Sequence, residues 1–543
     1  MRPLDAEILN ATALVVDANA TSRSVLVSML RECGISKITQ TPRALEARKV
    51  LELRRFDIVV CEYHFPDEPM TGQDLLDDLR LANVLPLSSV VVMISSEAGY
   101  AHVAEAAEAA LDAYLIKPHT EQALRERLVQ ARLRKRSLQE IIRLVENDDF
   151  LAAAELCQAR FETHGPYWVH AARIGAELWL RLAKPHAAQK MFEAIMQVRA
   201  LPWARLGVAR TQYEAGGAQL ARRTLESLLE EQPGYADAYD VMGRVLLDQG
   251  EPDQAIEALR RAAGLTPGCV GRLVKLGLLA FYYGNAKEAT DALQKASRLG
   301  LQSKVFDLQG LVLLGALQFD AGDGRALSRS LDSMAFARQQ APESPRLRRF
   351  EDVLNALVQL QQRSVPEAIA VIRRLLSEVQ APNFEFEAAC NLLMLLSRLH
   401  LQELRLEEAE HNVGIIGRRF AVSRITLELL VRSVQGQAGF ERALQQAYGE
   451  ITAAAEEAVS HTVEGQPQEA VRLLLEHAQR TFNAKLIDLA THTLERHRQT
   501  IDDAAALGEQ ANELHRRYRS YGTQVHLSRA DDPRTMASAA RSR

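Results

Sequence analysis

The stretch Phe56–Pro66 reads Phe-Asp-Ile-Val-Val-Cys-Glu-Tyr-His-Phe-Pro. Its β-branched run predicts a buried strand over 57–61, which leads to an acid, Glu62, and then to a loop. Open α/β sheets carry their functional sites at the carboxyl ends of parallel strands. Glu62 is therefore the first candidate functional residue of the chain.

Strands and helices alternate on both sides of this stretch. Further strands are expected at 13–16, 37–39, 90–94 and 113–116. Helices are expected across 25–30, 43–53, 73–81 and 101–110, and a last one begins near 120. Strands that alternate with helices indicate a parallel sheet that is covered on both faces.

Several residues of this segment stand in the order and at the spacing typical of one signalling family. They are Asp17, Glu62, Pro66, Gly72, Ser95, Tyr114, Lys117 and Pro118. On these residues the chain resembles the response-regulator receiver family over about residues 11–130. The resemblance implies an α/β domain over 1–130, with a flavodoxin-like fold and a parallel five-stranded sheet.

The resemblance also implies roles for these residues. Glu62 occupies the phospho-acceptor position, and Asp17, Ser95 and Lys117 would complete the receiver pocket. Tyr114 matches the switch aromatic of the family. The peptide bond that follows Lys117 is cis in the family.

Two departures from the family pattern bear on the chemistry of the pocket. Ala18 stands where the family has the second acid of its pair, and Glu62 replaces the acceptor aspartate. Mg²⁺ needs oxygen ligands in tight octahedral geometry, and phosphoryl transfer relies on that metal. We therefore expect no cofactor, no bound Mg²⁺ and no phosphorylation at this position.

Two interpretations of Glu62 stay open. Its longer side chain places the charge nearer to where a phosphoryl group on aspartate would lie, so it could act as a fixed surrogate of the phosphorylated state. In that case its pairing with Lys117 would bias Ser95 and Tyr114 toward the active arrangement. The alternative is a decayed receiver in which the Glu62–Lys117 ion pair is only structural.

The segment after this domain is rich in helix-forming residues and basic side chains. Residues 120–146 contain neither Pro nor Gly, so the last receiver helix is expected to continue into a helical connector over 131–147. Residues 121–143 hold seven Arg or Lys against three Glu. Such a run is either a solvated helix face or a contact for an acidic partner or another subunit.

A repeated pattern dominates the rest of the chain. Residues 236–267 resemble a tetratricopeptide repeat, and the pattern of small and apolar residues returns thirty-four residues later. A fixed period of this length is typical of an all-α helical solenoid. Repeats are expected over 148–525, most clearly at 199–300, before a disordered tail at 526–543.

The first helix of each repeat is expected to line a concave, partner-binding face. The candidates on it are Asp237, Asp240, Arg244, Leu247, Val274, Leu278 and Phe281. The family's Lys/Asn clamp for a terminal carboxylate is missing, so an internal segment or a folded partner is favoured over a C-terminal peptide. The alternative is that some of these side chains pack against neighbouring repeats.

Composition excludes several classes of function. The net charge of −5 and the pI near 6.3 argue against binding of nucleic acid or an anionic membrane. Five scattered cysteines fit a reducing cytoplasm and indicate no metal site. Membrane insertion is not expected, because no long uninterrupted apolar run occurs. The chain also lacks the G-x-x-x-x-G-K, H-E-x-x-H and G-x-S-x-G motifs, so it is not expected to be an enzyme.

These features together predict a cytoplasmic signalling adaptor that acts by protein–protein binding. Its partners would be a histidine kinase, a phosphotransfer protein or another receiver, and homodimer formation stays open. A second hypothesis is a regulator that promotes dephosphorylation of a partner receiver or kinase. A third is a response regulator that is still phosphorylated, on a secondary acid such as Asp57.

Overall fold

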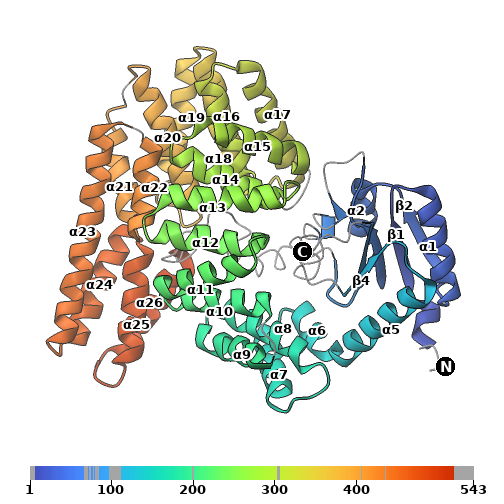
Figure 1. Cartoon of the computed structure of the whole chain (residues 1–543). Helices are drawn as coiled ribbons and strands as arrows, with labels where there is room; N and C mark the ends of the chain where they lie inside the picture. Colours follow the sequence, from blue (N-terminus) through green and yellow to red (C-terminus); the bar gives the residue numbers. More distant parts are fainter. Residues whose placement is uncertain are drawn as a thin grey trace. The chain divides into compact units, whose positions relative to one another are not determined.

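A computed structural model describes residues 6–66, 71–72, 75–76, 79, 85–96, 112–198, 201–301, 306–404, 406–434 and 436–518 (Figure 1). The expected helix at 101–110 and the expected tail at 526–543 lie outside the described residues, and the expected helix at 73–81 lies only partly within them. No helix of the described residues is both long and apolar enough to cross a membrane.

The N-terminal part forms the expected parallel sheet. After a short 3-10 helix, η1 (Ala6–Asn10), its strands are β1 (Thr12–Val16), β2 (Lys37–Thr41), β3 (Ile58–Glu62), β4 (Val90–Ser95) and β5 (Ala113–Ile116). They pair in the order β2-β1-β3-β4-β5, and all four pairings are parallel. Three helices of this part are described in full: α1 (Ala20–Glu32), α2 (Ala44–Leu53) and α5 (Glu121–Ser137).

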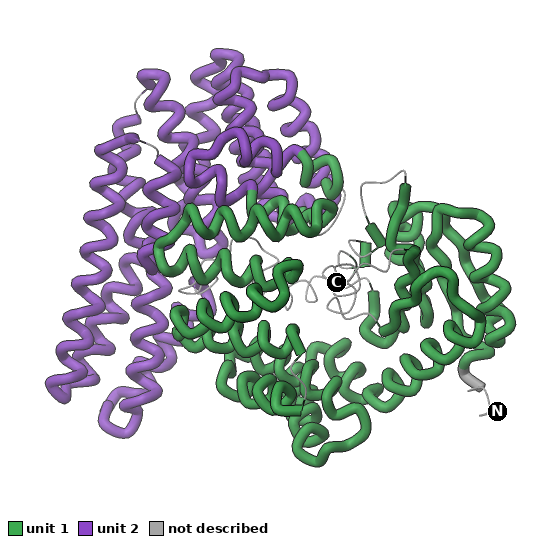
Figure 2. Tube along the Cα trace, viewed as in Figure 1, with its two compact units in different colours: residues 1–276, 295–306, 528–543 green, residues 277–294, 307–527 purple. Residues whose placement is uncertain are grey.

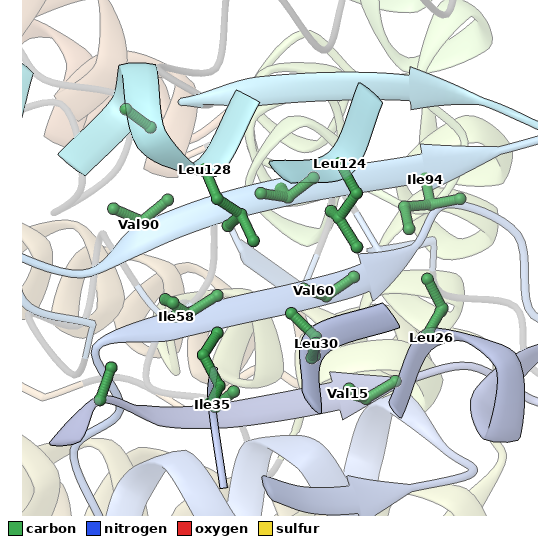
Figure 3. Packing of buried hydrophobic residues seen from close by; sticks show 14 of the residues in the cluster. Val15, Leu26, Leu30, Ile35, Ile58, Val60, Val90, Ile94, Leu124 and Leu128 are labelled. Carbon is green, nitrogen blue, oxygen red and sulfur yellow. The ribbon is translucent and has the colours of Figure 1, made fainter. Parts of the chain in front are cut away.

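Each face of the sheet carries its own hydrophobic core. On one face, Leu26 and Leu30 of α1 and Leu124 and Leu128 of α5 cover the strands, as Figure 3 shows. On the other face, α2 and the side chains of Leu75, Leu76 and Leu79 pack on the alternate strand residues. The alternation of the strand side chains thus produces two buried faces, as expected for a parallel sheet.

The helix after β5 does not continue without a break. α5 ends at Ser137, and α6 (Gln139–Glu146) begins after Leu138, whose ψ of 10° departs from helical geometry. The carbonyl oxygen of Ser137 accepts a hydrogen bond from the side chain of Arg160, which lies in the helix that follows α6. The prediction of one continuous helix over 120–146 is therefore wrong.

The remaining chain is a series of helices. Those after α6 are α7 (Phe150–Glu162), α8 (Trp168–Arg181), α9 (Pro185–Val198), α10 (Pro202–Glu214), α11 (Ala218–Glu231), α12 (Ala236–Asp248), α13 (Pro252–Leu265), α14 (Val270–Tyr282), α15 (Ala286–Gly300), α16 (Gln309–Asp320), α17 (Gly324–Gln340), α18 (Pro345–Gln361), α19 (Val365–Ser377), α20 (Phe386–Leu401), α21 (Ala409–Phe420), α22 (Arg424–Val434), α23 (Ala438–Val463), α24 (Pro467–Thr481), α25 (Ala484–Arg496) and α26 (Ala504–Tyr518).

The thirty-four-residue period is visible in the turns between paired helices. Gly216, Gly250 and Gly284 follow α10, α12 and α14 at this spacing, and all three have positive φ angles of 85°, 79° and 80°. Such a backbone conformation favours glycine. Within a pair, Gly243 of α12 lets Leu259 of α13 approach closely, because a Cβ there would lie 3.1 Å from the leucine. The predicted all-α repeat architecture is thereby confirmed.

The chain divides into two compact units, which are coloured in Figure 2. The first runs up to Leu276 and includes Lys295–Phe306, and the second includes Gly277–Gln294 and continues from Asp307. The division falls within α14 and α15. The expected borders at 130/131 and 147/148 lie inside the first unit and stay predictions.

Candidate functional site

The sheet brings four of the predicted site residues to its carboxyl edge. Asp17 follows β1, Glu62 ends β3, Ser95 ends β4 and Lys117 follows β5. Because these strands are parallel neighbours, their ends meet at the same edge. Asp17, Glu62 and Ser95 are buried, at 2, 7 and 0 % exposure.

Glu62 is held through both carboxylate oxygens. Its Oε1 accepts hydrogen bonds from the backbone N–H groups of Tyr63 at 3.0 Å and His64 at 3.5 Å. Its Oε2 accepts from the ammonium group of Lys117. The extra methylene of glutamate lets one carboxylate reach the lysine and the backbone of its own loop together.

Asp17 is bound from three directions. Its Oδ1 accepts from the backbone N–H of Asn19 at 2.7 Å, and its Oδ2 accepts from Ser22 Oγ at 2.5 Å and Lys117 Nζ at 3.0 Å. Arg23 donates to the carbonyl oxygen of Asp17 at 2.6 Å. Sequence reasoning missed Asn19, Ser22 and Arg23, although their place at the start of the helix that follows Asp17 could have pointed to them.

Lys117 links the two carboxylates. Burial alone lowers the pKa of Lys117, but hydrogen bonds and charge attraction from Glu62 and Asp17 outweigh that effect and raise the pKa above its ordinary value. The ammonium group therefore stays charged at physiological pH. One cation and two anions, all largely shielded from water, make up the charged part of the pocket.

The fold family implies Mg²⁺ at this edge, and the residues present do not fit it. Ala18 supplies no carboxylate, and the donors described above already occupy all four carboxylate oxygens of Asp17 and Glu62. An octahedral ion would have to displace the Lys117 ammonium, which itself carries positive charge. This donor set suits an ammonium group better than a hard divalent cation.

Gly72 supports the strand end that carries Glu62. A Cβ at Gly72 would lie 2.0 Å from the backbone oxygen of Glu62, so no other residue fits without a shift of the backbone. The N–H of Gly72 also donates to the carbonyl oxygen of Tyr63 at 2.7 Å. The glycine that the resemblance singles out thus serves close backbone packing.

Asp57 lies away from these charges, and Tyr114 packs against a hydrophobic core of the sheet. Tyr114 is half-buried, aligned with Met93 of β4, and packs against the core on the α2 face. Asp57 precedes β3, and its carboxylate accepts from the backbone N–H and the hydroxyl of Thr12, both at 2.8 Å. Asp57 is therefore a strand-start contact at the end of β3 opposite to Glu62. The peptide bond between Lys117 and Pro118 is cis, as the resemblance implies.

The predicted concave face is only partly open. Leu247, Val274, Leu278 and Phe281 are buried, with exposures of 4, 1, 3 and 5 %. The prediction that these four line an accessible partner-binding face is wrong, because close helix packing covers them. The alternative, packing within the repeats, agrees with their burial.

The three charged candidates of that face are engaged within the first unit. Asp237 and Asp240 both pair with Arg272 of α14, the latter at 2.8 Å. Arg244 lies 3.4 Å from a carboxylate oxygen of Glu214. The side chain of Asp237 remains 47 % exposed, so this part of the face stays accessible.

Comparison with known proteins identifies the N-terminal domain. A family model described as "Response regulator receiver domain" matches residues 13–129. Chemotaxis protein CheY-3 of Vibrio cholerae is 34 % identical over 119 residues, which is 22 % of this chain and 89 % of that protein. Chemotaxis protein CheY of Pseudomonas aeruginosa is 32 % identical over 115 residues, or 21 % of this chain and 90 % of that protein.

A solved structure is similar to part of this chain. It is a thermophilic TPR protein of Thermus thermophilus, with 25 % identity and a TM-score of 0.26, and the match covers 34 % of this chain and 95 % of that one. The sequence relatives cover only 22 and 21 % of this chain, so they do not describe the whole of it. Through its residues 13–129, with the pocket of Asp17, Glu62 and Lys117, this chain belongs to the response regulator receiver domain family.

Proposed function

We propose that the chain is a cytoplasmic adaptor of two-component signalling that acts by binding proteins and has no enzymatic activity of its own. The receiver would dock on a histidine kinase, a phosphotransfer protein or another receiver, and the repeats would hold a second partner. A receiver domain fused to a tetratricopeptide-like region supports this proposal, because stacked helical repeats form extended binding surfaces.

The observation that carries the proposal is the link between Lys117 and both carboxylates of the pocket. Glu62 already places a permanent negative charge on Lys117 and on the backbone N–H of Tyr63. In this proposal Glu62 stands for the phosphoryl group, and the receiver binds its partner without Mg²⁺ and without phosphorylation. The pocket is then a constitutive binding state rather than a switch.

The third hypothesis, phosphorylation on Asp57, receives no support from the contacts of that residue. Its carboxylate accepts hydrogen bonds from Thr12 at the start of β1. This is the edge of the sheet opposite to the one where the Lys117 ammonium lies. For the second hypothesis, dephosphorylation of a partner, no contact in the described part of the chain favours one side chain over another.

The test compares Glu62→Gln and Glu62→Asp with the wild type. Gln keeps the shape but removes the charge, so we expect the capture of histidine kinases, phosphotransfer proteins or receivers to fall about tenfold, within the usual range for coupling between two sites. Quantitative mass spectrometry of affinity captures from the source cell measures this. Glu46→Gln is the matched control, because Glu46 lies exposed in the first turn of α2 and its loss changes the net charge equally.

Incubation with a small phosphodonor and Mg²⁺, followed by intact-mass measurement, completes the test. We expect no phosphoryl adduct on the wild type. An adduct on the wild type, or equal capture of partners by wild type and Glu62→Gln, would overturn the surrogate role of Glu62.

A further inference from the structure

The last turn of α5 returns to the receiver at the edge opposite to the pocket. Arg134 Nη2 donates to Asp112 Oδ1 at 2.6 Å and to the carbonyl oxygen of Asp112 at 3.2 Å. Lys135 Nζ lies 3.2 Å from the same Oδ1 and donates to the carbonyl oxygen of Leu87 at 2.6 Å. Asp112 precedes β5 and Leu87 precedes β4. Arg134 and Lys135 therefore bind the chain at the starts of these strands.

Asp112 is part of the sheet as well as of this contact. Its Oδ2 accepts from the backbone N–H of Val91 in β4 at 2.9 Å, and its side chain is only 4 % exposed. A carboxylate buried to this degree needs its partners, because removal of one member of a buried ion pair leaves an uncompensated charge. Arg134 and Lys135 supply that compensation from α5.

The first repeat helices contribute to the same contact. Glu146 of α6 accepts from Ser88, through its backbone N–H at 3.2 Å and its hydroxyl at 3.0 Å. His170 of α8 lies with its Nε2 3.4 Å from Arg134 Nη1. A guanidinium group only donates, so the Nε2 accepts and must be unprotonated.

The protonation of His170 agrees with this role. Burial, followed by the positive charges of Arg134 and Arg173, lowers the pKa of His170 to about 4. The imidazole is therefore neutral at physiological pH and adds no repulsion to Arg134. The contact does not change through the neutral pH range.

The two strands bound at their starts, β4 and β5, lead to pocket residues at their other ends. β4 runs from Val90 to Ser95, and β5 runs from Ala113 to Ile116, directly before Lys117. At about 3.3 Å per residue, roughly 13–20 Å of buried parallel strand separates the two ends. A packed strand of this length transmits a displacement better than a loop.

We propose that Asp112, Arg134, Lys135 and Glu146 form a clamp that joins the receiver sheet and the helices α6–α8 into one cooperative unit. The break at Leu138 makes this clamp necessary, because a continuous helix alone no longer fixes the direction of α6. A partner that binds the pocket edge then stabilises the first repeat helices through β4 and β5. That last consequence rests on the proposed adaptor function, whereas the clamp itself does not.

The test is amide hydrogen exchange of the full chain, followed by mass spectrometry, on Asp112→Asn. We expect exchange to accelerate about tenfold or more in β4 and β5 and also in α6–α8, because the clamp would couple their opening. The matched control is Asp57→Asn. Asp57 likewise precedes a strand and holds Thr12, but no described contact joins it to α5–α8.

The control should accelerate exchange near β1 and leave α6–α8 within about twofold of the wild type. The proposal is overturned if Asp112→Asn loosens β4 and β5 while α6–α8 keep their wild-type exchange, or if both variants affect α6–α8 equally. Neither result depends on partner capture by Glu62 variants, so failure of the clamp and failure of the adaptor proposal are separable.

A second variant tests the clamp from the repeat side if Asp112→Asn does not fold. Glu146→Ala should accelerate exchange of the β4 amides, although the change lies in α6. Glu140→Ala is its control, because Glu140 is an exposed acid on the same helix. Unchanged exchange in β4 of Glu146→Ala would contradict the clamp.

Discussion

At the residue scale, a single ammonium group compensates the negative charge of the pocket. Lys117 contacts Asp17 and Glu62 together, and about a quarter of its side chain (25 %) reaches solvent. The two carboxylates tolerate their proximity because this cation lies between them. Its own pKa is raised, so its stabilising contribution is present below its ordinary value of 10.5 and is lost only as pH rises through the higher folded value.

We predict that Lys117→Met destabilises the receiver throughout the neutral pH range. Two carboxylates would then repel each other without compensation, at a cost of about 2–4 kcal/mol near pH 8, somewhat less than for a fully buried pair. Above pH 10.5 the wild type itself begins to lose the Lys117 charge, so the difference between variant and wild type should shrink toward about pH 11. Denaturant unfolding of the variant at both pH values measures this.

Lys37→Met serves as the control for that prediction, since Lys37 is exposed at the start of β2 and its loss changes the net charge equally. A Lys117→Met defect that is independent of pH would show that the ammonium acts through packing alone. Restoration by a second change, Glu62→Gln, would confirm that charge repulsion is the cause.

At the scale of elements, helix beginnings meet around a single arginine in the second unit. Arg346, in the first turn of α18, lies 2.8 Å from Asp307, 3.5 Å from Glu385 and 2.7 Å from Glu387. Asp307 precedes α16, and the two glutamates stand at the start of α20. Three acids share one guanidinium group, so protonation of at least one of them lowers the repulsion among the carboxylates.

We predict that the stability of the second unit falls as pH rises from about 4.5 to about 7. Burial, opposed by Arg346 and aided by Asp307 and Glu385, raises the pKa of Glu387 from 4.5 to about 7. The folded state therefore binds this proton more tightly than the unfolded state does, and stability is lost as the proton leaves. The loss should amount to about 1–3 kcal/mol, toward the lower end because 27 % of the side chain reaches solvent.

Glu387→Gln should remove this pH dependence and should be more stable than the wild type above pH 7. The contrasting variant is Glu378→Gln. At Glu378 burial raises the pKa, but hydrogen bonds from Arg348 and Arg349 outweigh it and lower the net value, so its contribution is lost as pH falls. Thermal unfolding between pH 5 and 8.5 distinguishes the two, and equal pH profiles of wild type and Glu387→Gln would contradict the prediction.

At the scale of the whole molecule, the cysteines report on the integrity of separate cores. Cys61 lies in the receiver sheet, Cys157 in α7 and Cys390 in α20, and all three are buried. Burial raises the pKa of Cys61, and it raises the pKa of Cys157 and Cys390 to about 12. Since the thiolate is the reactive form, these thiols should be inert in the folded chain.

We predict that an alkylating reagent labels Cys269 before any other cysteine of the native protein, because Cys269 alone of the five is partly exposed. Peptide mass spectrometry after short labelling at pH 8 gives the order, and labelling in denaturant is the control. Early labelling of Cys157 or Cys390 would mean that the repeat core opens more readily than its burial indicates.

Local patterns along the chain predicted much of this architecture. The strand expected at 90–94 is β4 at Val90–Ser95, and the thirty-four-residue spacing recurs in the turn glycines Gly250 and Gly284. These features follow from hydrogen bonding and side-chain alternation within a few residues, so the sequence alone determines them. The resemblance to the receiver family likewise implied that Asp17, Glu62 and Lys117 meet.

Only the tertiary structure decided which predicted residues are accessible and where the helix breaks. Leu247 and Phe281 have the periodicity of an exposed repeat face, yet packing buries them. The break at Leu138 needs neither Gly nor Pro, because Arg160, twenty-three positions beyond Ser137, satisfies the carbonyl that it frees. Both outcomes depend on contacts between residues far apart in the chain. A local sequence pattern does not specify which distant side chain makes such a contact.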